Sequence, residues 1–153
     1  MSKPIYIVFT IGALLGLAVS VLEFVKYCAL QLAYEPFNKI ASVLLIILII
    51  YAIYWGVKEV RDRFYEGNIK FSKAFLFGTG IAFVAFVVVF FYLILHYSYI
   101  DVDGLQRISE NNDTLAPLTN VVTASLMFSF SVFLYGILLN LFVAMYVYRS
   151  KSA

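Results

Sequence analysis

Residues 40–57 read IASVLLIILIIYAIYWGV, and residues 58–73 read KEVRDRFYEGNIKFSK. The first stretch has no charged residue, whereas half of the second is charged. An apolar helix of about 18–20 residues is long enough to cross a hydrocarbon core of about 30 Å. The change in composition after Val57 therefore predicts a helix that leaves a membrane and continues about two turns into water.

Three further apolar runs flank this stretch, over residues 5–27, 74–97 and 121–148. None alternates as a membrane β-strand does, and a helix satisfies its own backbone hydrogen bonds in lipid. We predict an all-α membrane protein with four transmembrane helices in an antiparallel bundle, forming a single domain over residues 1–153. The expected helices are residues 5–27, 40–66, 72–97 and 119–148, with a basic inner loop at 58–73 and an acidic outer loop at 98–118.

The overall composition points to the same class of protein. Hydrophobic residues make up 63% of the chain, against roughly 45–50% in soluble domains. Cys28 is the only cysteine and His96 the only histidine, so neither an intramolecular disulfide nor a Cys- or His-rich metal site can form. A net charge of +2 is too small to suggest a nucleic-acid partner. No catalytic motif is present, and we expect neither an enzyme nor a cofactor.

Lys and Arg are distributed unevenly between the two sides of the expected bundle. Cytoplasmic connections of membrane proteins are enriched in these residues. One side carries only Lys26, Lys39 and Arg107. The other carries Lys3, Lys58, Arg61, Arg63, Lys70, Lys73, Arg149 and Lys151. This bias predicts that both termini lie in the cytoplasm.

Small and polar residues recur at helical spacing in the first and last apolar runs. Such residues let membrane helices approach closely, and their side chains can hydrogen-bond across an interface. Two alternatives are open: packing within this bundle, or the interface of a homo-oligomer or partner subunit. The residues of this predicted contact surface are Gly12, Gly16, Ser20, Ser125, Ser129, Gly136 and Asn140.

Two ionisable residues inside the apolar runs need an explanation. Glu23 precedes Lys26 by three positions, which predicts a local ion pair rather than an ion pathway. His96 lies among tyrosines near the outer end of its run. Its position favours the aromatic belt at the membrane interface, with pH sensing as the alternative.

The inner loop and its flanks resemble the domain of unknown function 4199 family. The resemblance is carried by Gly56, Val57, Lys58, Arg61, Asp62, Gly67, Ile69, Phe71, Lys73, Ala74, Phe75 and Gly78. It implies a small four-helix protein of the bacterial inner membrane, mostly of Bacteroidota, and it implies no activity. The chain departs from the family pattern in its longer, charged outer loop and in Asn140.

The inner loop itself has two interpretations. It could be a docking surface for a partner, or it could contact anionic lipid headgroups with retained positive charge. Ion pairs are expected between Glu59 and Arg63 and between Lys58 and Asp62, and Gly67 is expected to end the helix. The candidate residues are Lys58, Arg61, Asp62, Arg63, Gly67, Phe71, Lys73 and Gly78.

The acidic outer loop partly matches a calcium-binding loop. Asp101, Asp103 and Glu110 have the spacing of three carboxylate ligands, but Tyr99 stands where the first ligand is required. An ordinary Asp-Gly turn is therefore the main interpretation. A surface for an extracytoplasmic partner is the remaining alternative.

These patterns predict a non-catalytic structural or accessory membrane protein. It would act through helix–helix or partner contacts and touch the lipid bilayer, with anionic headgroups at its inner face. The alternative is a small oligomeric transporter or lipid-binding protein built around a shared cavity.

Overall fold

The computed structural model describes residues 4–31, 36–103, 105 and 120–150. These residues form long helices and contain no strand. The helices are α1 (Pro4–Gln31), α2 (Pro36–Phe64), α3 (Phe71–Leu95) and α5 (Val121–Arg149), and a π-helical turn, η1 (His96–Ile100), continues α3.

All four long helices of the described chain are long and apolar enough to cross a membrane. The mean hydropathy of the best window is 2.5 in the first three spans and 2.1 in the last. Large apolar side chains also cover the outside of the bundle, for example Phe142 and Leu76. A surface of this kind is stable only in lipid. The chain is therefore a multi-pass membrane protein with an all-helical fold.

The observed helix ends differ from the expected ones by up to four residues, for local reasons. Helix α2 begins at Pro36 rather than residue 40, because proline is well suited to a first helical turn. It ends at Phe64 rather than residue 66, because Glu66 and Gly67 adopt φ of 48° and 78°. Helix α5 begins at Val121 rather than residue 119, because the side chain of Asn120 accepts hydrogen bonds from the first turn.

Helices α1 and α3 also run beyond the expected limits. Helix α1 continues from residue 27 to Gln31. The charge of Lys26 does not end the helix, because its Nζ pairs with Glu23 Oε2 of the same helix at 2.9 Å. Helix α3 begins at Phe71 and passes into η1, where the amide of Asp101 donates to the carbonyl of His96 at 2.9 Å. This i to i+5 bond extends the helical backbone to Ile100.

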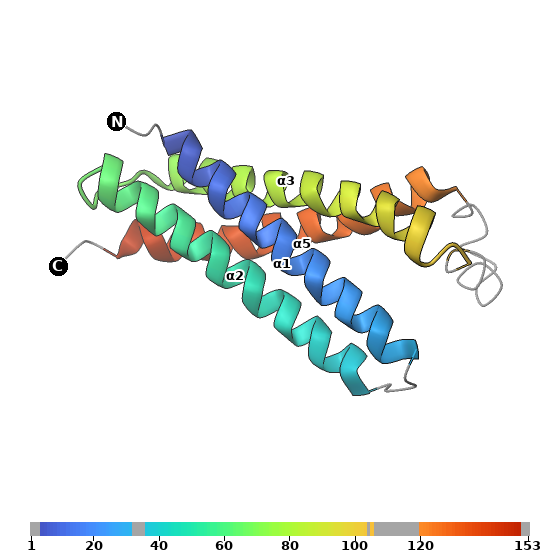
Figure 1. The fold of residues 1–153 in the computed structure, drawn as a ribbon. Coiled ribbons are helices and arrows are strands. Elements are labelled where there is room, and N and C mark those ends of the chain that lie inside the picture. Colours follow the sequence, from blue (N-terminus) through green and yellow to red (C-terminus); the bar gives the residue numbers. More distant parts are fainter. Residues whose placement is uncertain (1–3, 32–35, 104, 106–119, 151–153) are drawn as a thin grey trace.

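The described start of α1, the turn between α2 and α3, and the end of α5 lie at one end of the molecule (Figure 1). We call this the basic end, because described cations gather there. Helix α2 crosses α5 near this end and diverges from it toward the opposite end, where η1 lies (Figure 1). The cations of the basic end are Lys58, Arg61, Arg63, Lys70, Lys73 and Arg149.

The core consists of aliphatic stripes on each helix, packed around the small residues of α3. Ala74, Ala85 and Ile81 on α3 are completely buried. Gly12 and Gly16 bring α1 against this helix, since a Cβ added to either would lie 2.6 Å from the Cβ of Val84 or Val88. Such close approach increases the van der Waals contact that holds membrane helices together.

Candidate functional site

The side chain of Arg61 is the centre of a contact between α2 and α5 at the basic end. The residue is only 5% exposed. Its Nη1 donates to the carbonyl and hydroxyl of Ser150, at 2.7 and 2.6 Å, and to the carbonyl of Val147 at 3.3 Å. Its Nε donates to the carboxylate of Asp62 at 2.7 Å. Arg61 therefore satisfies carbonyls at the C-terminus of α5, where a cation also interacts favourably with the helix dipole.

Backbone hydrogen bonds close the end of α2 directly after Arg61. The amides of Tyr65 and Gly67 both donate to the carbonyl of Arg61, at 3.0 and 3.3 Å. Gly67 takes the left-handed conformation that commonly ends a helix, as the sequence predicts. The Arg61 side chain therefore extends from the last turn of α2, whose backbone is held by the turn that follows it.

Asn140 makes the corresponding contact between α5 and α3. Its Nδ2 donates to the carbonyl of Phe75 at 2.8 Å and to the hydroxyl of Thr79 at 3.1 Å. A Cβ added to Gly78 would overlap the Asn140 amide group. Asn140 Oδ1 has no conventional hydrogen-bond partner within the described chain, and it faces the Cα hydrogen that this Cβ would replace. That geometry matches the weak Cα–H···O contacts found at helix interfaces.

The other predicted packing residues also lie inside the bundle. Gly136 faces Ala82 of α3, where an added Cβ would be 2.7 Å from the alanine Cβ. The hydroxyls of Ser20 and Ser129 donate to carbonyls of their own helices, those of Gly16 and Ser125, at 2.8 and 2.6 Å. The structure thus uses this set of residues between α1, α3 and α5. The buried Ser125 Oγ has no hydrogen-bond partner among the residues described.

The charged residues of the loop at 58–73 divide into those that form ion pairs and those that are exposed without one within the described chain. Arg63 forms the expected ion pair with Glu59. The expected pair between Lys58 and Asp62 is not present, because Asp62 binds Arg61 instead. The ammonium group of Lys58 lies 5.9 Å from the centre of the Tyr54 ring.

Phe71 and Lys73 extend the same surface from the start of α3. Both are exposed, and the Phe71 ring stacks on Phe75 with centroids 6.0 Å apart. The Lys73 ammonium lies 4.7 Å from the centre of the Tyr65 ring, which is cation–π geometry. The exposed cations are thus interleaved with aromatic rings, an arrangement typical of the membrane interface.

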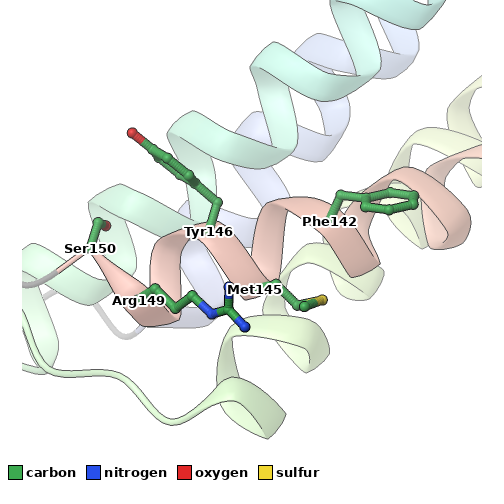
Figure 2. A pocket seen from close by; sticks show the side chains of 5 residues that line it. All are labelled: Phe142, Met145, Tyr146, Arg149 and Ser150. Atoms are coloured by element: carbon green, nitrogen blue, oxygen red, sulfur yellow. The ribbon is translucent and has the colours of Figure 1, made fainter.

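A hollow of about 420 Å³ lies on the outer face of α5 at the basic end (Figure 2). It was not among the sites predicted from the sequence. It is lined by Phe142, Met145, Tyr146, Arg149 and Ser150. The first four recur at the i, i+3, i+4, i+7 spacing of one helical face, which is the signal from which their common orientation could have been predicted.

The opposite end contains a cluster of aromatic side chains around His96. This residue is only 6% exposed, so its ring packs inside the bundle. Its ring makes an edge contact with Tyr27 of α1, with centroids 5.1 Å apart. Its Nδ1 lies 3.3 Å from the hydroxyl of Tyr92. His96 therefore joins α1 to α3 at this end.

The structure describes two of the three calcium candidates. Asp101 is half-buried and Asp103 is exposed, whereas Glu110 lies outside the described residues. No group of three or more His, Cys, Asp or Glu side chains that could hold a metal ion occurs in the described part of the chain.

Comparison with known proteins places the whole bundle in a single family. No curated protein and no solved structure matches the chain. The sequence model of the family described as "Protein of unknown function (DUF4199)" matches residues 10–149, from within α1 to the last residue of α5, and the chain belongs to this family.

Proposed function

We propose that this chain is a non-catalytic structural or accessory membrane protein that acts through contacts with partner proteins and lipids. One observation carries the proposal: the buried Arg61 and Asn140 use their donors to join helices. Arg61 binds the end of α5, and Asn140 binds the backbone of α3. Catalysis or ion transport in a helical bundle requires polar groups that converge on a substrate site. Here the strongest donors are already occupied by the protein's own backbone.

The proposed setting is a bacterial inner membrane, with an antiparallel bundle and both termini in the cytoplasm. The cluster of cations at the basic end supports this orientation, because cytoplasmic connections are enriched in Lys and Arg. At that face, the exposed Lys58, Lys70 and Lys73 would contact anionic headgroups, each contributing about 1 kcal/mol.

Cysteine labelling in intact cells tests the orientation. In a Cys28→Ser chain, Asn68→Cys and Val102→Cys place one thiol at each end, and both positions are exposed. A membrane-impermeant maleimide should label only Val102→Cys until the membrane is permeabilised. Labelling of Asn68→Cys in intact cells would reverse the proposed orientation.

Cross-linking within the membrane, followed by affinity purification and mass spectrometry, tests the function. A partner protein recovered in stoichiometric amount is the expected result. Its recovery should fall when the exposed Lys70 and Lys73 are both changed to Gln, while the Arg63→Gln control should retain it, because Arg63 is already paired with Glu59. A homo-oligomer that protects a solute and recovers no protein partner would contradict the proposal and favour a transporter.

A further inference from the structure

The hollow on α5 is apolar toward the middle of the membrane span and charged at the end of the span. Phe142 and Arg149 are separated by seven residues, or roughly 10 Å along the helix. The Phe142 side chain is 70% exposed on the part of α5 that lies deeper in the span, and Arg149 is at the end of the span. Figure 2 shows Met145 and Arg149 extending to the same side of α5, with Tyr146 on the other side. An apolar surface thus leads directly to a guanidinium group.

Arg149 is available to bind an anion. It is exposed and forms no ion pair within the described chain, in contrast to Arg61 and Arg63. A guanidinium group presents several donors in a plane and suits the oxygens of a phosphate.

The surroundings of Arg149 favour negative charge despite its place at a helix C-terminus. Carbonyls at such an end would normally repel an anion. Here Arg61 donates to the carbonyls of Val147 and Ser150, and Ser150 also lines the hollow, so a buried cation partly neutralises this helix end. On the other side, Tyr146 contacts Tyr54 with ring centroids 5.9 Å apart, and the Tyr54 ring in turn lies near the Lys58 ammonium.

We propose that this hollow binds one anionic phospholipid of the adjacent leaflet. The phosphate binds the guanidinium of Arg149, and the acyl chain packs along Met145 and Phe142. The hollow is open to the outside of the bundle, and its volume of about 420 Å³ has room for the phosphate and the adjoining part of one chain. This proposal rests on the proposed contacts between the basic end and anionic headgroups. It specifies where one such lipid binds and which class of lipid is preferred. A lipid is favoured over a soluble phosphate because the apolar half of the hollow faces the hydrocarbon core.

Native mass spectrometry of the purified full chain in detergent tests the site. Dioleoyl phosphatidylglycerol and dioleoyl phosphatidylcholine are titrated separately, and bound lipid is counted. The anionic lipid should bind more tightly, and Arg149→Gln should weaken its binding about fivefold. The same change should weaken the binding of phosphatidylcholine less, because the choline ammonium offsets the attraction of its phosphate for the guanidinium. Lys70→Gln removes the same charge from the same end outside the hollow, and it should change the affinity for the first, most tightly bound lipid less than about twofold. Arg149→Glu should abolish the preference for the anionic lipid.

Each contrary result overturns the site in a distinguishable way. If Arg149→Gln and Lys70→Gln weakened binding of the anionic lipid equally, the attraction would be a diffuse effect of charge. The lipid site in the hollow would then be wrong, while the proposed function would stand. Equal affinity for the two lipids, or a preference that survives Arg149→Glu, would exclude the charge-specific site. Competition by soluble glycerol 3-phosphate would assign the site to a soluble phosphate and overturn the lipid. Both Arg149 variants should melt at the wild-type temperature in detergent, since this side chain is exposed.

Discussion

The basic end and the opposite end of the bundle hold their helices together by different means. At the basic end, a buried guanidinium joins α2 to α5 through three hydrogen bonds, and farther into the span Asn140 joins α5 to α3. At the opposite end, where α3 continues into η1, an edge contact of Tyr27 with the His96 ring joins α1 to η1. Helix α2 diverges from α5 there, and its apolar side chains Val43 and Ile47 are more than half exposed (Figure 1).

This difference follows from where water is available. In hydrocarbon, a buried donor without a partner costs several kcal/mol, so a charged group is placed where backbone carbonyls are already exposed at helix ends. Arg61 meets the end of α5 in this way. Lipid chains, by contrast, are as apolar as leucine and can fill the space between diverging helices at little cost. We therefore expect the basic end to be the fixed point of the bundle, where the helices are held together most firmly, and the opposite end to be the part that changes shape more easily.

The largest effect is expected from Arg61→Met, which keeps most of the apolar length and removes every donor. The carbonyls of Val147 and Ser150 lose their partner, and the loss should be about 3 kcal/mol in the free energy of unfolding. Denaturation in mixed micelles, followed by the fluorescence of the single tryptophan, Trp55, measures it.

The matched control is Arg63→Met, which removes an exposed arginine two residues away. Its ion pair with Glu59 lies on the surface, so the expected loss is below about 0.5 kcal/mol. Equal losses for the two variants would mean that the contact with α5 contributes nothing specific, and the basic end would cease to be the fixed point.

A smaller effect, about 2 kcal/mol, is expected from Gly78→Ala. The new methyl group would overlap the Asn140 amide and separate α3 from α5. Gly80→Ala is the control in the same helix, because there the nearest atom is a movable methyl group of Val8 at 3.0 Å. Its effect on the unfolding free energy should be less than about 1 kcal/mol, partly offset by the higher helix propensity of alanine.

A double variant separates steric overlap from a general weakness of α3. Adding Asn140→Ala to Gly78→Ala removes the group that the methyl would meet, so the two losses should be less than additive. Strict additivity in the same denaturation assay would show that Gly78 and Asn140 act independently, contrary to their contact in the structure.

Much of this architecture could be predicted from the sequence, because its strongest signals are local. The uncharged stretch at 40–57 specifies a membrane-length helix by itself, and α2 spans it. The motif that indicates the family also lies in one segment, from Gly56 to Gly78. The end of α2 at Gly67 is likewise a property of neighbouring residues.

The contacts that join the helices depend on pairs distant in the sequence. Gly78 and Asn140 were both identified, but their pairing across 62 positions has no signal in a single sequence. Arg61 lies in a charged segment, where a surface role is the usual expectation. A signal for its burial was present nonetheless: Ile53, Val57 and Arg61 follow one another at intervals of four on the buried face of α2. Extending the helical period through the charged segment would have placed Arg61 inside the bundle.

The smallest effects are expected at the opposite end, from changes at Tyr27. Its hydroxyl lies 3.5 Å from the carbonyl of Ile100, which is long for a hydrogen bond, so Tyr27→Phe should lower the unfolding free energy by less than about 0.5 kcal/mol. Tyr27→Leu also removes the edge contact with the His96 ring and should cost about 1 kcal/mol. The same micelle denaturation assay ranks these variants against Arg61→Met. A loss from Tyr27→Leu as large as that from Arg61→Met would show that the aromatic contacts fasten the bundle as firmly as the guanidinium, because a single ring contact would then match three hydrogen bonds to a buried charge.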